Sequence, residues 1–138
     1  MYPRLKALDH EQCWALYLTR SHLLIGEECL STGGRYRLDI DIPILLRRAL
    51  DKQAAYVILV HNHPGGGPSP SPADIEMTRR IQQAFKLMGL VLMDHLVIAE
   101  GCFFSFDADR RFDMLPGSAC HEENLLNSKQ LATFTSNK

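Results

Sequence analysis

The sequence has 138 residues, which is enough for one domain with a single buried core. Hydrophobic residues make up 46% and charged residues 22%, the proportions of an ordinary globular protein rather than a disordered chain. With 15 Lys and Arg against 16 Asp and Glu, the formal net charge is −1. Because this balance gives no general attraction for nucleic acid, we expect no direct nucleic-acid partner.

The sequence shows no basic and apolar leader and no long apolar run. We therefore expect neither a signal peptide nor a membrane span, no membrane partner, and a cytoplasmic location. The oligomeric state is not predicted. Four cysteines without close paired spacing are expected to be reduced thiols rather than a zinc knuckle or a disulfide framework. These are Cys13, Cys29, Cys102 and Cys120.

The first half of the sequence predicts a strand hairpin followed by a helix. Residues 13–19 and 23–30 are apolar runs typical of buried strands, and the polar turn between them indicates a hairpin. A short strand is expected about residues 36–40. Asp41 can cap a helix over residues 43–53, where apolar side chains recur at helical spacing.

The second half predicts a central strand, a long helix and two more strands. Residues 55–60 are a continuous apolar run, typical of a strand covered on both sides. A helix that begins after Ser71 and ends at Gly89 follows, with an apolar stripe on its inner face. The stripe consists of Ile75, Ile81, Phe85 and Met88. Residues 90–99 and 102–106 are expected to form a further pair of strands.

Two histidines close the central strand. His61 and His63 are two positions apart, so their side chains point to the same face of the strand. Pro64 disfavours the helical conformation for His63 and keeps it extended. Asp74 lies in the first turn of the next helix, where the helix dipole favours a carboxylate. Two histidines, one aspartate and an open position are the donor set of a catalytic zinc site.

A structural alternative exists for part of this pattern. Ser71 and Asp74 also fit a helix capping box, with Pro72 at the favoured first helical position. A His-x-His pair at a strand end is by itself a weak signal. The combination favours a metal site, because polar side chains close an apolar strand and a helix N-terminus follows at short range.

The same residues carry a family resemblance. His61-x-His63-Pro64 followed by Ser71-x-x-Asp74 resembles the JAMM motif of MPN/JAB-domain metalloproteases. The sequences His-Asn-His-Pro, Thr78-Arg79-Arg80 and Asp94-His95 narrow the resemblance to the RadC-like (UPF0758) branch. It covers roughly residues 9 to 106.

The resemblance implies an α/β fold, with a mixed β-sheet flanked by helices in cytidine-deaminase-like α/β/α layers. The expected catalytic domain spans residues 1–112, and residues 113–138 are expected to be a polar, flexible tail. Fuller RadC proteins have a helix-hairpin-helix region in front, whereas this sequence is expected to start at the catalytic domain. It departs from the usual Gly-Thr and Pro-Arg-Glu of the branch at Gly33-Gly34 and Pro43-Ile44-Leu45.

The resemblance also implies a mechanism. A zinc ion would be held by His61, His63 and Asp74, and the reaction would be hydrolysis of a peptide or isopeptide bond in a peptide or protein substrate. Glu11 would act as general base and then as acid to the leaving amine. Ser71 would donate a hydrogen bond to the developing oxyanion, with helix capping as its alternative role.

The role of Glu11 has rival residues in the sequence, and His95 has two interpretations. Without the family pattern, Glu11 is an exposed carboxylate at a strand start, and Glu27 and Glu28 compete for the role of base. His95 can be an outer hydrogen-bond partner of the site, but a satisfied buried histidine is the favoured interpretation. Its neighbour Asp94 points to the opposite face of the strand.

Three function classes follow. The first is a zinc-dependent peptidase or isopeptidase. The second is a DNA-repair role through DNA or protein partners, which the RadC resemblance suggests; the charge balance and the expected lack of a helix-hairpin-helix region argue against direct DNA binding. The third is a catalytically silent interaction module. The retained metal ligands argue against it.

Overall fold

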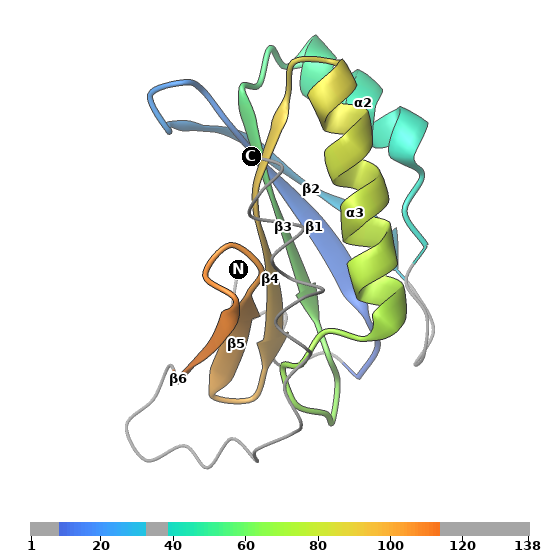
Figure 1. Ribbon diagram of the computed structural model, residues 1–138, viewed down its shortest axis with the longest axis vertical. Coiled ribbons are helices and arrows are strands. Elements are labelled where there is room, and N and C mark those ends of the chain that lie inside the picture. The colour runs from blue at the N-terminus through green and yellow to red at the C-terminus, as the bar shows by residue number, and fades with distance from the viewer. Residues whose placement is uncertain (1–8, 33–38, 114–138) are drawn as a thin grey trace.

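The computed structural model describes residues 9–32 and 39–113, which form one mixed β-sheet and two helices (Figure 1). The strands are β1 (Gln12–Leu18), β2 (Leu24–Thr32), β3 (Tyr56–Asn62), β4 (Val91–Ala99), β5 (Cys102–Ser105) and β6 (Arg110–Asp113), and the helices are α2 (Ile42–Asp51) and α3 (Pro72–Leu87). The sheet order is β2-β1-β3-β4-β5-β6. Among these neighbours only β3 and β4 run parallel. The mixed α/β class expected from the sequence is confirmed.

The local signals in the sequence correspond to observed elements. β1 and β2 form the expected hairpin, with His22 in the turn at a φ of 66°. Asp41 caps α2 by accepting the N–H of Ile44 at 3.1 Å. Gly89 follows α3 at a φ of 72°, which favours glycine. Met88 was expected on the inner stripe but lies at the C-cap and is about half exposed.

Some expectations are wrong, and others concern residues outside the described ranges. β6 was not predicted, because its sequence Arg-Arg-Phe-Asp has no apolar alternation and is ordered by pairing with β5. Cys13 and Cys29 are free thiols as expected, whereas Cys102 is disulfide-bonded. The strand expected about residues 36–40 lies largely outside the described residues, and the expected tail lies almost entirely outside them.

Both helices pack on the same face of the sheet (Figure 1). Alternate residues of the strands point into this helix-covered core, which is the larger of two apolar clusters. Its fully buried members include Ala15, Tyr17, Leu45, Leu59, Ile81 and Phe85. No helix of the described ranges covers the opposite face, where Val60 and Ile98 pack with partly buried neighbours. The second helical layer of the expected α/β/α arrangement is therefore not found in residues 9–32 and 39–113.

The chain path brings three elements to one end of the sheet. α3 connects the parallel strands β3 and β4, so its first turn follows the carboxyl end of β3. β1 runs antiparallel to β3, and Cys13 pairs with His61. The start of β1 therefore lies beside the end of β3. Ligand sites in α/β sheets commonly form at such carboxyl ends of parallel strands.

Neither helix of the described ranges combines the length and the apolar composition that crossing a bilayer would need.

Candidate metal centre

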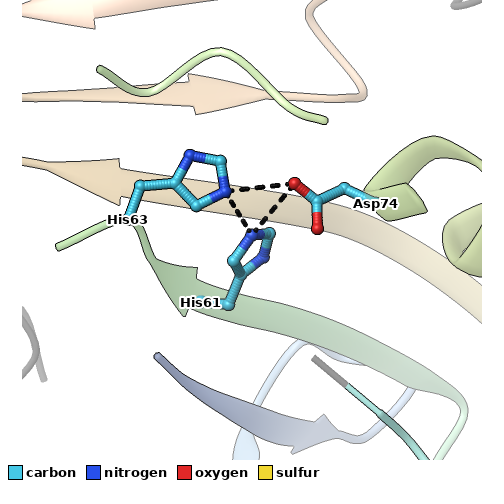
Figure 2. A group of neighbouring side chains, drawn as sticks. All are labelled: His61, His63 and Asp74. Carbon is cyan, nitrogen blue, oxygen red and sulfur yellow. Dashed lines mark hydrogen bonds and ion pairs between the residues drawn. The ribbon is translucent and has the colours of Figure 1, made fainter. Parts of the chain in front are cut away.

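The three predicted metal ligands converge at this end of the sheet (Figure 2). His61 comes from β3, His63 follows the strand, and Asp74 projects from the first turn of α3. His61 Nε2 lies 3.0 Å from His63 Nε2 and 3.4 Å from Asp74 Oδ2, and His63 Nε2 lies 3.1 Å from the same carboxylate oxygen. One donor atom from each side chain therefore faces a common point.

These separations fit a small metal ion. A tetrahedral zinc ion with ligand bonds of about 2.0–2.1 Å holds its donor atoms about 3.3 Å apart. The observed distances of 3.0, 3.1 and 3.4 Å lie close to that value. The group can therefore hold one metal ion and leave a fourth position for another ligand.

His63 is fixed by one hydrogen bond from its main chain and one from its ring. Its backbone N–H donates to the carbonyl of Ile98 on β4 at 2.8 Å, which extends the sheet one residue beyond β3. Its Nδ1 lies 3.1 Å from the carbonyl oxygen of Gly67. Because a carbonyl can only accept, Nδ1 carries the hydrogen and Nε2 is the nitrogen left for a metal. Gly65, at a φ of 67°, allows the turn that brings Gly67 back.

Asp74 combines the two roles that the sequence left open. The backbone N–H of Ser71 donates to Asp74 Oδ2 at 2.8 Å, and the N–H of Asp74 donates to Ser71 Oγ at 3.1 Å, so a capping box is present. The same oxygen Oδ2 faces both histidines. Burial alone would raise the pKa of Asp74, but the neighbouring imidazoles of His61 and His63 and the backbone N–H of Ser71 outweigh burial and keep the pKa well below the usual range. The carboxylate is therefore ionised and ready to bind a cation.

The capping role of Ser71 leaves its hydroxyl hydrogen available. A hydroxyl has one hydrogen to donate and two lone pairs that accept. In the capping box Ser71 Oγ only accepts, from the N–H of Asp74. Ser71 is partly exposed at the start of α3, beside the metal ligands. Capping and donation to a substrate oxygen are therefore compatible.

Glu11 lies at the metal centre, immediately before β1. Its carboxylate is partly buried and interacts electrostatically with His63, His61 and Asp74. Burial raises the pKa of Glu11, and the two histidines oppose that shift. The isolated sequence suggested an exposed carboxylate here, whereas in the structure the carboxylate is partly buried and lies within electrostatic range of the group formed by His61, His63 and Asp74.

The rival glutamates lie away from the centre. Glu27 and Glu28 pair with the middle of β1, not with its first residues. Glu28 accepts a hydrogen bond from the hydroxyl of Tyr17 and pairs with Arg48 Nη1 at 2.6 Å. Its carboxylate therefore ties β2 to α2, and Glu27 is exposed.

Sequence reasoning missed the role of Asn62, the residue between the two histidines. Asn62 is 2% exposed, and its Oδ1 accepts the N–H of Gln12 at 2.7 Å. Its Nδ2 donates to the carbonyl of His10 at 2.9 Å. These two bonds hold the peptide groups on both sides of Glu11 to the strand that carries the histidines. The only signal in the sequence is a hydrogen-bonding side chain between the two histidines.

Replacing Asn62 should therefore destabilise this end of the sheet. Asn62→Ala leaves the N–H of Gln12 without its partner, and an unsatisfied buried donor costs about 1–3 kcal/mol. We expect a loss of that size in the free energy of unfolding, measured with urea on metal-free protein. Asn62→Asp keeps an acceptor for Gln12 but cannot donate to His10, so it should also be destabilised. An unchanged urea midpoint for both variants would contradict the assignment.

His95 was expected to be a satisfied buried histidine, and its burial is confirmed. It is fully buried and lies outside the group of metal ligands. The outer-partner alternative also holds, because His95 Nε2 lies 2.6 Å from His61 Nδ1. Its other nitrogen contacts Thr78 Oγ1 at 2.6 Å. Thr78 was not identified from the sequence as part of the site.

Comparison with known proteins agrees with this geometry. A family model described as RadC-like JAB domain matches residues 1–112. A UPF0758 protein of Porphyromonas gingivalis is 41% identical over 105 residues, which is 75% of this chain and 46% of that protein. UPF0758 proteins of Rhodobacter capsulatus and Flavobacterium johnsoniae are 46% and 36% identical over 72% and 77% of this chain, and 46% of each relative. The chain therefore spans about half the length of the curated relatives it matches.

Proposed function

Because this chain belongs to the RadC-like JAB domain family, we propose that it is a zinc-dependent hydrolase of the JAMM type that cleaves a peptide or isopeptide bond. The observation that carries the proposal is the convergence of His61 Nε2, His63 Nε2 and Asp74 Oδ2 within 3.0–3.4 Å of one another. Glu11 adds a partly buried carboxylate beside them. Together they supply three metal ligands and a separate acid-base group.

The donor set supports zinc. Two imidazoles and one carboxylate leave a position for water or substrate, as catalytic zinc sites do. A bound zinc ion would supply a water that ionises near neutral pH, and the ion itself would polarise a carbonyl oxygen of the substrate. Two histidines and one carboxylate can also hold non-haem iron, so iron is the competing metal.

The residues of the chain have separate tasks in this proposal. Glu11 accepts a proton when the nucleophile forms and transfers it to the leaving amine, as a general base and then a general acid do. Ser71 donates its remaining hydrogen to the oxyanion that develops on the substrate carbonyl. Asn62 keeps the backbone of Glu11 aligned with the metal ligands.

The proposed substrate is a peptide or protein, as the resemblance to JAMM metalloproteases implies, and Glu11 would then protonate the leaving amine. The curated relatives are about twice as long as the matched region, so parts beyond this chain's length can contribute to substrate choice in them. A DNA-linked role is the alternative. The near balance of 15 Lys and Arg against 16 Asp and Glu does not favour it.

Metal content tests the proposal directly. Protein purified without added zinc should contain about one zinc per chain by elemental analysis. His63→Ala removes one of three ligands and should lose the metal, whereas Arg47→Ala on the exposed face of α2 should keep it. Stoichiometric iron would overturn the choice of zinc. A metal-free wild-type protein that cannot be reconstituted with zinc would overturn the proposal itself.

A further inference from the structure

A chain of buried hydrogen bonds runs behind the metal ligands. His61 Nδ1 lies 2.6 Å from His95 Nε2, and His95 Nδ1 lies 2.6 Å from Thr78 Oγ1. Thr78 Oγ1 in turn lies 2.6 Å from the backbone carbonyl oxygen of Asp74. The chain thus joins β3, β4 and α3, and it begins and ends at residues that supply metal ligands. His61, His95 and Thr78 are at most 1% exposed.

The direction of these hydrogen bonds follows from counting hydrogens. A carbonyl oxygen can only accept, so the single hydroxyl hydrogen of Thr78 points to Asp74. This is the usual bond of a helical threonine to the carbonyl four residues earlier. Thr78 Oγ1 can then only accept from His95, so His95 Nδ1 carries a hydrogen.

The second nitrogen of His95 faces His61. The ring is fully buried and stacks on Phe106 at a centroid distance of 4.8 Å and an interplanar angle of 8°. Only one hydrogen can lie between His95 Nε2 and His61 Nδ1, which are 2.6 Å apart. A neutral imidazole that binds a metal through Nε2 carries its hydrogen on Nδ1, so at the proposed metal centre His61 Nδ1 is the donor and His95 Nε2 the acceptor.

We infer that Thr78 and His95 are positioning residues that fix His61 as its Nδ1–H tautomer, with the Nε2 lone pair directed at the metal site. The inference rests on the proposed metal centre. The opposite tautomer would place a hydrogen on His61 Nε2, the atom that lies 3.0 Å from His63 Nε2 and 3.4 Å from Asp74 Oδ2. A metal could then bind only after that proton had moved.

Thr78 is the informative residue to change, because it touches neither metal-binding nitrogen. Thr78→Val keeps the branched shape but removes the hydroxyl, so His95 Nδ1–H loses its acceptor and His95 can carry its hydrogen on Nε2 instead. Loss of an outer partner commonly weakens metal binding by about 10–100-fold. Thr78→Ser keeps the hydroxyl and is the matched control.

The first measurement is zinc affinity by competition with a chromophoric chelator at fixed pH. Thr78→Val should bind zinc about 10–100-fold more weakly than the wild type, and Thr78→Ser should stay within about threefold. His95→Phe keeps a ring to stack on Phe106 but cannot accept from His61, so it should resemble Thr78→Val. Circular dichroism on each variant verifies that it is folded.

The second measurement reads the tautomer without metal or activity. Long-range ¹H–¹⁵N NMR spectra of metal-free protein should show His61 protonated on Nδ1 in the wild type and in Thr78→Ser, and a shift towards Nε2 in Thr78→Val. A wild-type His61 protonated on Nε2, or a folded Thr78→Val with wild-type zinc affinity, would overturn the inference. If the wild type binds no zinc, the proposed function fails, and the NMR result still decides the tautomer.

Discussion

Glu11→Gln is expected to keep its zinc and to lose at least about a hundredfold of its hydrolytic activity, the lower range for removal of a general acid-base group. The amide preserves the shape of the side chain and removes only the ability to accept a proton. Glu11 supplies none of the three converging donor atoms, so metal binding should be unaffected. The proposed function assigns this role to Glu11, whose carboxylate is partly buried and interacts electrostatically with His63 and His61.

The measurement compares hydrolysis rates of a mixture of synthetic peptides by mass spectrometry, with wild type and variant at equal zinc occupancy. Glu27→Gln is the matched control, because Glu27 is exposed on β2 and pairs with the middle of β1. It should retain wild-type activity. A fully active Glu11→Gln, or a Glu27→Gln that loses activity, would refute the assignment of the base.

Asp74→Asn should abolish tight zinc binding while preserving the start of α3. The amide oxygen can still accept the N–H of Ser71, but it carries no charge to offset that of the metal. Because Asp74 is a ligand, the loss should exceed the upper value of about a hundredfold for an outer partner. Chelator competition measures the zinc affinity, and urea unfolding of metal-free protein measures the stability of the fold.

Ser71→Ala should lose stability but keep zinc, which is the opposite of the result expected for Asp74→Asn, so it serves as the control. It removes the hydroxyl that accepts the N–H of Asp74, which should cost about 1 kcal/mol of unfolding free energy, as loss of an N-cap does. Zinc should stay bound, since Ser71 offers no ligand to the group. An Asp74→Asn protein with wild-type zinc affinity would show that the carboxylate serves the helix cap alone.

The sequence by itself determined the elements that depend on neighbouring residues. The spacing of His61 and His63 places both rings on one face because side chains alternate along a strand. Asp41 and Ser71 mark helix starts because their side chains bond to N–H groups within the next turn. The positive φ at Gly89 follows from its place just after α3. Each of these features requires only a few consecutive residues.

Only the tertiary structure decided which side chains complete the site. Asn62 reaches Gln12 and His10 because β1 pairs with β3, which brings together residues far apart in the sequence. The same pairing brings Glu11 within electrostatic range of the candidate ligands, whereas Glu28 forms an ion pair with Arg48 on α2. Such contacts depend on strand register and packing, which local spacing does not specify.

The contact between Thr78 and His95 has the same origin. The sequence around Thr78 indicates only a threonine within a helix, and the sequence around His95 indicates only a polar residue in an apolar strand. They meet because α3 packs against β4, and His95 meets His61 because β4 lies parallel to β3. The sequence alone therefore indicated the three candidate metal ligands. The surroundings that orient them arise from side chains on separate elements, whose contacts exist only once the sheet and helix are packed.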